Sequence, residues 1–410
     1  MTAHTILIVI LVIFVFDFVL DTVLSYLNLC YKKNGIPPEL EGIYTPENYQ
    51  KSLDYQRIYF RFSLLARSLS FVLMMMMLLS GAFGWIYDTL GNYFSNPIWQ
   101  GLAFFAVLGL GGDILSLPLQ LYSIFVIEEK FGFNKNTLSN FFVDKLKGYL
   151  LGALLGGLIG YAFFYLVIHL EQNFWILFWV IFMAFSLFMN AFYTTLLLPL
   201  FNKLTPLEDG ELRQAIEQYC QKVKFPLTNL FVMDGSRRST KANAFFSGIG
   251  KRKKIVLFDT LIEKHTLEEL VAVLAHEVGH YKKRHIPQSI ILSAIQMGVI
   301  LYILSLFIFN LQLSLALGSQ SLGIALNLMA FSFLFSPISM IIGLFFNVLS
   351  RKNEFEADRF ARDTYHGDAL SQALKKLSAD NLSNLNPHPL YVFFNYSHPP
   401  LLQRLKALRL

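Results

Sequence analysis

Charged residues are scarce in this sequence. Asp, Glu, Lys and Arg make up 15% of the 410 residues, whereas ordinary soluble domains carry roughly 25%. Hydrophobic residues reach 54% and the mean hydropathy is +0.48, which excludes an ordinary soluble globular protein. The two cysteines, Cys30 and Cys220, exclude a disulfide scaffold and a cysteine-ligated zinc cluster. Because no segment of about 20–50 residues recurs, a solenoid is excluded as well.

Long apolar runs are what the sequence has instead. A bilayer-spanning helix needs about 20 such residues, and seven stretches qualify, at about 5–28, 63–86, 98–126, 148–169, 174–200, 287–313 and 321–349. We therefore predict a mainly α-helical protein with seven transmembrane helices. The predicted organisation is helices 1 to 5 in residues 1–200, a catalytic insert at 201–286, helices 6 and 7 in 287–350, and a tail at 351–410.

The distribution of Lys and Arg predicts the orientation in the membrane, because positive charge accumulates in loops that are not translocated. Every second connection between the predicted spans contains none of the 34 Lys and Arg residues, whereas the insert at 201–286 is rich in them. Asp88 and Ser319 are thus expected outside, and Lys253 and the carboxyl terminus in the cytoplasm. The net charge of +6 and the basic run at 251–254 are then membrane-facing or hairpin charges, and no nucleic-acid partner is expected.

Inside the insert, residues 228–234, 242–248 and 254–260 are predicted to form short strands, and residues 267–285 a helix. This helix contains the sequence HEVGH at 276–280. His276 and His280 are one turn apart on one helix face, so both imidazoles can reach one zinc ion. Glu277 between them can act as the general base. We therefore predict a helix that supplies two metal ligands.

A catalytic zinc ion takes three protein ligands and keeps one position open. The extended motif H-E-x-x-H-x-x-G-x-x-H is excluded, because Lys283 and Ile286 occupy its last two defined positions. His285 is excluded too, because at about 100° per residue it projects to the opposite face of the predicted helix. The third ligand must come from elsewhere in the chain.

The sequence NEFEAD at 353–358 directly follows the last apolar stretch. We assign Glu354 as the third zinc ligand and Asp358 as the acceptor that orients a zinc-bound histidine. Glu356 is the rival ligand, although it faces roughly 200° away from Glu354 on a helix. Antiparallel packing of the last two spans brings both motifs to the cytoplasmic membrane surface.

With these motifs, the sequence resembles the type I CAAX prenyl proteases, seven-span membrane zinc proteases that cut the carboxyl-terminal tripeptide from prenylated proteins. RSTKANAFFSG at 238–248 resembles their substrate-binding edge strand, and SHPPLLQRL at 397–405 their closing His-Pro motif. The resemblance implies that Asn243 and Ala244 hold the peptide, that His398 and Arg404 stabilise the tetrahedral intermediate, and that the helices enclose a chamber beside a small α/β gluzincin-like catalytic region. From the residues alone, Asn243 is equally compatible with a turn and His398 with the entry to a helix.

The expected reaction is hydrolysis of a peptide bond by one Zn²⁺ per chain. The expected partners are a protein or peptide substrate, prenylated if the resemblance holds, and the lipid bilayer. Lys241 stands where the family often has His, and the compact chain favours a bacterial homologue of the inner membrane; a eukaryotic member would lie in the membrane of the endoplasmic reticulum. The sequence does not determine the oligomeric state, and a monomer is compatible with it.

Two other functions each share a feature with this sequence. A quality-control membrane protease of the heat-shock type shares the H-E-x-x-H motif but generally has fewer spans. A transporter would explain ionisable residues inside the spans, namely Asp17, Asp21, Arg67 and Asp113, but it has no use for the zinc motif. For Asp21 and Arg67 we favour an ion pair between the first two spans; the alternative is that they line a hydrated chamber.

Overall fold

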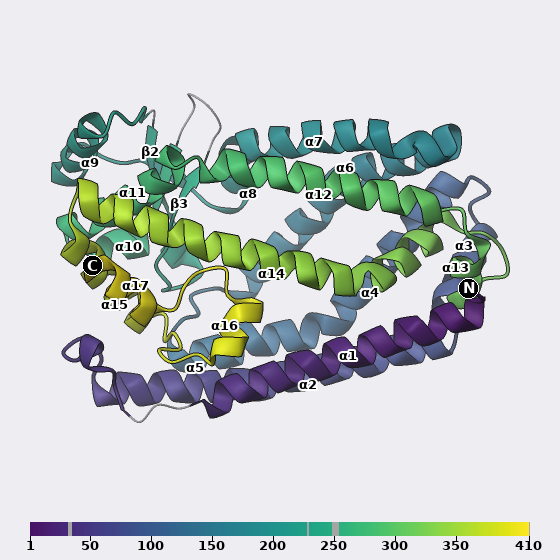
Figure 1. Cartoon of the computed structure of the whole chain (residues 1–410), viewed down its shortest axis with the longest axis horizontal. Helices are drawn as coiled ribbons and strands as arrows, with labels where there is room; N and C mark the ends of the chain where they lie inside the picture. The colour runs from purple at the N-terminus through teal and green to yellow at the C-terminus, as the bar shows by residue number, and fades with distance from the viewer. Residues whose placement is uncertain (32–34, 228, 248–253, 410) are drawn as a thin grey trace.

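The computed structural model describes residues 1–31, 35–227, 229–247 and 254–409. Gly248 and the basic residues 251–253, including the topology marker Lys253, lie outside the described residues. Long helices run side by side along the long axis of the molecule, and the catalytic insert and the tail lie together at one end (Figure 1). The long helices are α1 (Ala3–Cys30), α2 (Pro46–Leu79), α4 (Pro97–Tyr122), α6 (Leu138–Leu170), α7 (Phe174–Phe192), α12 (His285–Phe307) and α14 (Ile324–Thr364).

Six helical stretches of the described residues are long and apolar enough to cross a membrane, rather than the seven expected. The difference arises in the stretch Leu138–Phe201, which is 64 residues long. It contains both α6 and α7, joined by the short 3₁₀ turn η3 (Glu171–Asn173), and the two helices pack against each other. Glu171 in this turn has a φ of 48°, a left-handed conformation that interrupts the helix.

Helix α14 is continuous for 41 residues and passes through the predicted boundary at residue 350. Its first part packs in the apolar core of the bundle, and its last turns carry the NEFEAD sequence. The third predicted metal ligand therefore lies on the same rigid helix as the last apolar stretch. A rigid continuation of a span places a side chain more reproducibly than a loop does.

The insert folds around a four-stranded sheet in the order β1-β2-β4-β3 within the described residues. β2 pairs parallel with β4, and β3 pairs antiparallel with β4 and forms an edge. The strands are β1 (Leu204–Pro206), β2 (Asn229–Met233), β3 (Ala244–Ser247) and β4 (Lys254–Phe258). The helices of this end are α9 (Glu211–Lys222), α10 (Asp259–Lys264), α11 (Leu267–Lys282), α15 (Gly367–Asp380), α16 (Pro389–Asn395) and α17 (Leu401–Arg409). The three strands predicted from the sequence are present, with shorter bounds.

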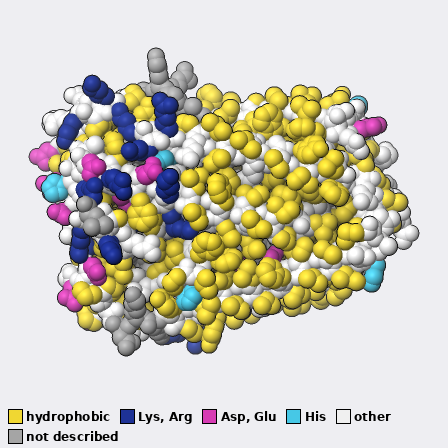
Figure 2. Space-filling view, viewed as in Figure 1, with side chains coloured by type: hydrophobic (Ala, Val, Ile, Leu, Met, Phe, Trp, Pro, Cys, Tyr) yellow, Lys and Arg dark blue, Asp and Glu magenta, His cyan; other side chains and the backbone are white. Residues whose placement is uncertain are grey.

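The surface of the molecule divides into two regions. Hydrophobic side chains cover the sides of the helical bundle, whereas Lys and Arg gather at the end that carries the insert and the tail (Figure 2). On the sides of the bundle, large apolar residues such as Val12, Leu154 and Ile341 are more than 60% exposed. Such an apolar surface is stable only against lipid.

The opposite end of the bundle is closed by the short helices α3 (Ala82–Gly91) and α13 (Leu311–Ala316) (Figure 1). There Ser319 Oγ donates a hydrogen bond to Asp88 Oδ1 at 2.6 Å. The two residues predicted to share one side of the membrane are thus in contact. Gly84 N donates to Leu317 O at 2.8 Å, and the backbones approach so closely that a Cβ at Gly84 would lie 2.0 Å from Ser319 N.

The predicted ion pair between Asp21 and Arg67 is not formed. Among the described residues, the Arg67 side chain donates to Ser25 Oγ at 3.1 Å and to a backbone carbonyl, and no carboxylate lies within ion-pair distance. Both residues line a cavity of about 610 Å³, which agrees with the alternative of a polar interior. Asp113 instead forms an ion pair with Lys145.

We predict that Gly84→Ala destabilises the protein by about 1–3 kcal/mol or more, because the added methyl group overpacks a backbone contact. The measurement is the thermal unfolding midpoint in detergent. Gly157→Ala on α6 is the control, since no atom lies within 4 Å of its Cβ position and alanine favours the helix. Equal midpoints for the two variants would contradict the described contact between α3 and α13.

Candidate metal centre and substrate cleft

Helix α11 is held in place at its start and along its buried length. Thr266 and Glu269 form a capping box at its start, and Glu269 also pairs with Lys376 of α15 at 2.7 Å. These contacts satisfy backbone donors that a helix start otherwise leaves free. All residues from Leu270 to His276 are buried, so the helix has little freedom to rotate.

Gly279 allows α11 and α14 to pack closely. A Cβ at this position would lie 3.0 Å from Ala357 Cα and 3.1 Å from Ala357 O, closer than side chains normally approach. Only glycine therefore permits this helix separation without displacement. The close contact places the carboxylate of Glu354 beside the two histidines of α11.

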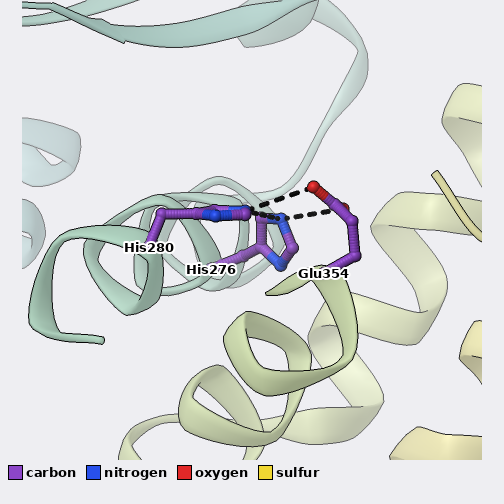
Figure 3. A group of neighbouring side chains, drawn as sticks. All are labelled: His276, His280 and Glu354. Carbon is purple, nitrogen blue, oxygen red and sulfur yellow. Dashed lines mark hydrogen bonds and ion pairs between the residues drawn. The ribbon is translucent and has the colours of Figure 1, made fainter. Parts of the chain in front are cut away.

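The side chains of His276, His280 and Glu354 point toward one another (Figure 3). The two Nε2 atoms are 3.2 Å apart. Glu354 Oε2 lies 3.4 Å from His276 Nε2, and Oε1 lies 3.3 Å from His280 Nε2. Within the described part of the chain, the buried Glu354 Oε2 accepts no hydrogen bond. Two imidazoles and a carboxylate converging in this way form a donor set that fits a metal ion.

Asp358 and Arg404 contact the metal-binding group of His276, His280 and Glu354. Asp358 Oδ1 lies 2.8 Å from His276 Nδ1, and the Arg404 guanidinium contacts both Asp358 oxygens at 2.8 and 2.6 Å. Asp358 is therefore placed as predicted, against a histidine. Burial acts to lower the pKa of His276, but the contact of its ring with the Asp358 carboxylate and the proximity of the Glu354 carboxylate outweigh burial and raise the pKa to about 9 in the metal-free protein.

A cavity of about 630 Å³ opens beside these residues. Glu277, which is half-buried, lines it together with His280, Glu354 and His398. The other end of the cavity lies between α7 and α12, whose contributing residues are Phe182, Met183, Ser186, Leu187, Asn190, Ile286, Ser289, Ile290, Ser293 and Met297. The cavity thus joins the polar site to a space at the helical bundle that both apolar and polar side chains line.

The edge strand β3 borders the same cavity through Ala244 and Phe245. Asn243 does not line it: the Asn243 side chain accepts a hydrogen bond from Ala244 N at 2.8 Å, at the start of the strand. An edge strand offers unpaired backbone groups to an extended peptide. The position of β3 is therefore suitable for binding substrate.

His398 and Arg404 both reach Glu354, but in different ways. The His398 side chain is 65% exposed, and its Nε2 lies 3.3 Å from Glu354 Oε1. The Arg404 side chain is only 11% exposed and is engaged with Asp358. His398 is accordingly open to the cavity, while Arg404 is held beneath the metal-binding group.

The prediction that His285 faces away from the site is wrong. Helix α11 ends at Lys282, Arg284 adopts a left-handed φ of 61°, and α12 begins at His285. His285 Nδ1 then lies 3.0 Å from His280 Nδ1, and its Nε2 lies 3.2 Å from Glu356 Oε2. A projection along one continuous helix could not reveal this turn.

The cavity walls on α7 and α12 were also missed by sequence reasoning. A usable signal was present, because Ser186 and Asn190, and likewise Ser289 and Ser293, are spaced four residues apart within apolar runs. Such spacing places polar side chains on one helix face. A polar stripe in a membrane span indicates a face that meets protein or water rather than lipid.

Lys241, the position that departs from the family pattern, is held by the membrane helices. Its Nζ contacts Glu128 Oε2 at 2.9 Å and Tyr55 Oη at 3.1 Å, and it lies 4.4 Å from the centre of the Phe133 ring. Lys241, three positions before the edge strand β3, is thus anchored to the bundle through Glu128.

Comparison with known proteins agrees with this geometry. A family model for the N-terminal region of CAAX prenyl proteases, described as five membrane helices, matches residues 25–203, and the model for peptidase family M48 matches residues 206–410. A CAAX prenyl protease 1 homolog of Arabidopsis thaliana is 36% identical over 402 residues, covering 94% of this chain and 93% of the relative. CAAX prenyl protease 1 of Saccharomyces cerevisiae is 32% identical, with 91% and 88% covered. The chain belongs to the CAAX prenyl protease family of M48 peptidases.

A solved structure extends the agreement to the whole fold. The crystal structure of Ste24p of S. mikatae superimposes with a TM-score of 0.93 at 31% identity, covering 99% of both chains. As a member of this family, the protein is a metalloendopeptidase and a multi-pass integral membrane protein. The family membership also favours this activity over a transporter and over a protease of the heat-shock type.

We predict that Gly279→Ala weakens metal retention and lowers the unfolding midpoint. The added methyl group pushes α14, and with it Glu354, away from the histidines by a few tenths of an ångström. Overpacking of this kind typically costs about 1–3 kcal/mol. Metal content after dialysis and thermal unfolding report the two effects separately.

Gly343→Ala is the control for this prediction, because Gly343 lies on the partner helix α14 with no atom within 4 Å of its Cβ position. This control variant should retain metal as the unmodified protein does. If Gly279→Ala also behaved like the unmodified protein, the close helix contact would not govern the geometry of the metal-binding group.

Proposed function

We propose that the protein is a zinc endopeptidase that hydrolyses a peptide bond near the carboxyl terminus of prenylated proteins, at the cytoplasmic face of the membrane. The observation that supports this most directly is the convergence of His276, His280 and Glu354 on one point at the wall of the substrate cavity. The prenylated substrate follows from the names of the relatives, which are CAAX prenyl proteases.

The spacing of the three ligands supports zinc. Three atoms that each lie about 2.0–2.1 Å from a tetrahedral ion are separated from one another by about 3.3 Å. The two Nε2 atoms are 3.2 Å apart, and the Glu354 carboxylate lies at a similar separation from both, with Oε2 3.4 Å from His276 Nε2 and Oε1 3.3 Å from His280 Nε2. The HExxH helix with a third glutamate from another helix is the ligand pattern of a gluzincin-like site, and His280 and Glu354 of this group line the cavity.

The catalytic roles follow from the positions of the side chains. When bound, zinc activates water and polarises the scissile carbonyl. Glu277, on the cavity wall beside both histidines, accepts the proton of the attacking water and passes it to the leaving amine. His398, exposed to the cavity, donates a hydrogen bond to the oxygen that becomes negative. Arg404 contributes positive charge from beneath Glu354.

The peptide is bound by addition to the edge strand β3. Ala244 and Phe245 border the cavity, so an extended peptide paired with β3 runs past the metal-binding group. Asn243 holds the start of this strand through its hydrogen bond to Ala244 N. The lipid of the substrate occupies the end of the cavity between α7 and α12, against apolar side chains such as Phe182, Leu187 and Ile290.

We also propose the finer membrane topology. Counted separately, α6 and α7 bring the number of spans to seven, with an outward amino terminus and the insert and tail in the cytoplasm. The concentration of Lys and Arg at the catalytic end supports this orientation, because basic residues are retained on the cytoplasmic side. A monomer suffices to form the site.

The first experiment separates proton transfer from metal binding. Glu277→Gln should keep its zinc while the rate falls by about 10²–10⁴-fold, since general-base catalysis typically supplies this factor. Glu354→Ala should lose both zinc and activity, because it removes a ligand. Zinc content and peptide hydrolysis are measured on each purified variant. Loss of zinc from Glu277→Gln, or stoichiometric zinc in an active Glu354→Ala, would refute these assignments.

The second experiment tests the lipid. A farnesylated peptide should have a KM more than tenfold below that of the same peptide without lipid, because burying only two methylene groups contributes about 1.6 kcal/mol. Ser293→Trp, which fills the cavity wall, should raise the KM of the farnesylated peptide alone. Ile295→Trp is the control, because Ile295 on α12 is 59% exposed and does not line the cavity. This variant should leave the KM values of both peptides unchanged. Equal KM values for the two peptides would contradict a lipid-binding cavity.

A further inference from the structure

The turn between α11 and α12 brings a third histidine into contact with the metal-binding group. Arg284 adopts the left-handed conformation that residues other than glycine rarely take, and this reverses the direction of His285. The His285 side chain is 5% exposed and lies between His280 and Glu356. The cost of a left-handed arginine indicates that the surrounding structure holds this turn in place.

The hydrogen-bonding capacity of the two rings allows only one arrangement when a metal is bound. His280 directs Nε2 toward His276 and Glu354, so this nitrogen needs a free lone pair for the metal. A neutral imidazole carries one proton, which must then be on His280 Nδ1. That proton points to His285 Nδ1, 3.0 Å away, which must accept it. The proton of His285 is consequently on Nε2, facing Glu356 Oε2 at 3.2 Å.

We propose that His285 and Glu356 form a positioning relay for His280. Glu356 accepts from His285 Nε2, and His285 Nδ1 accepts from His280 Nδ1, so the tautomer and the ring orientation of the metal ligand are both defined. His276 is held directly by a carboxylate, Asp358, whereas His280 is held by a carboxylate acting through a second imidazole. The relay rests on the metal site proposed above and adds two residues to it.

The surroundings of Glu356 agree with this role. Its side chain is 37% exposed, and the ammonium group of Lys352, which is itself 71% exposed, lies 3.9 Å from the oxygen that does not face His285. Glu356 is thus anchored to His285 by one oxygen and open to solvent on the other side. The three residues of the relay come from three helices, α11, α12 and α14, so it also connects the metal-binding group to both of the last two apolar helices.

The test is the zinc affinity of the full-length protein in detergent, measured by competition with a chelator. Loss of a group that orients a ligand typically costs 10–100-fold in metal affinity, and this loss is expected for His285→Phe. His285→Gln should recover a substantial part of it, because the amide oxygen can accept the proton of His280 Nδ1. Glu356→Leu should weaken zinc binding, while Lys352→Met should not change it.

Two further measurements separate the relay from a purely structural role. The double variant His285→Phe, Glu356→Leu should bind zinc no more weakly than His285→Phe alone, because the two residues act in series. In the cobalt-substituted protein, the visible absorption bands should shift in His285→Phe and return toward those of the unmodified protein in His285→Gln. An equal loss of zinc affinity in His285→Phe and His285→Gln, or an unchanged zinc affinity in His285→Phe, would overturn the relay.

Failure of the relay and failure of the proposed function give different results. Should the unmodified protein bind no zinc, the metal site itself is wrong. If the unmodified protein binds zinc tightly and Glu354→Ala does not, but His285→Phe binds as tightly as the unmodified protein, only the relay is rejected. A lower unfolding midpoint of metal-free His285→Phe with unchanged zinc affinity likewise shows a packing role and rejects the relay.

Discussion

The close contact between α11 and α14 is the constraint on which the site depends. One helix carries two histidines and the other carries two carboxylates, and neither helix has a complete metal-binding group by itself. Gly279 and Ala357 make up the contact, where even a single added methyl group would be crowded. Small residues at a helix crossing allow the backbones to approach, and here this approach sets the distance between ligands from different parts of the chain.

Burial of charge is the cost of this arrangement. Asp358 and Glu354 are almost completely buried, and buried carboxylates are tolerated only when they are paired and hydrogen-bonded. Arg404 compensates Asp358 with a two-point contact, and His276 adds a hydrogen bond. Glu354 has a buried oxygen without a hydrogen bond, which a bound metal ion would satisfy. Arg404, whose positive charge compensates these buried carboxylates, lies on α17 in the tail. The tail is therefore part of the site.

The membrane bundle contributes more than an anchor. The first part of α14 packs in an apolar core with α1, α4, α6 and α12, and the helix continues without interruption to its last turns, so the bundle fixes the helix that carries the metal ligand. Helices α7 and α12 form the far wall of the substrate cavity. Lys241 ties the segment before the edge strand to Glu128 of the bundle. The edge strand β3, the metal-binding group and the cavity beside them therefore share one framework.

Local patterns were sufficient for much of this protein. The HEVGH spacing, the apolar runs and the alternation of basic loops depend only on neighbours along the chain, and so the histidine pair, the spans and the nearby carboxylates could be read from the sequence. The family resemblance supplied Asn243, Ala244, His398 and Arg404. Only the tertiary structure decided the left-handed turn that returns His285 to the site, the absence of an ion pair between Asp21 and Arg67 within the described residues, and the meeting of α7 and α12 at one cavity, because each depends on how helices pack in space rather than on spacing along one helix.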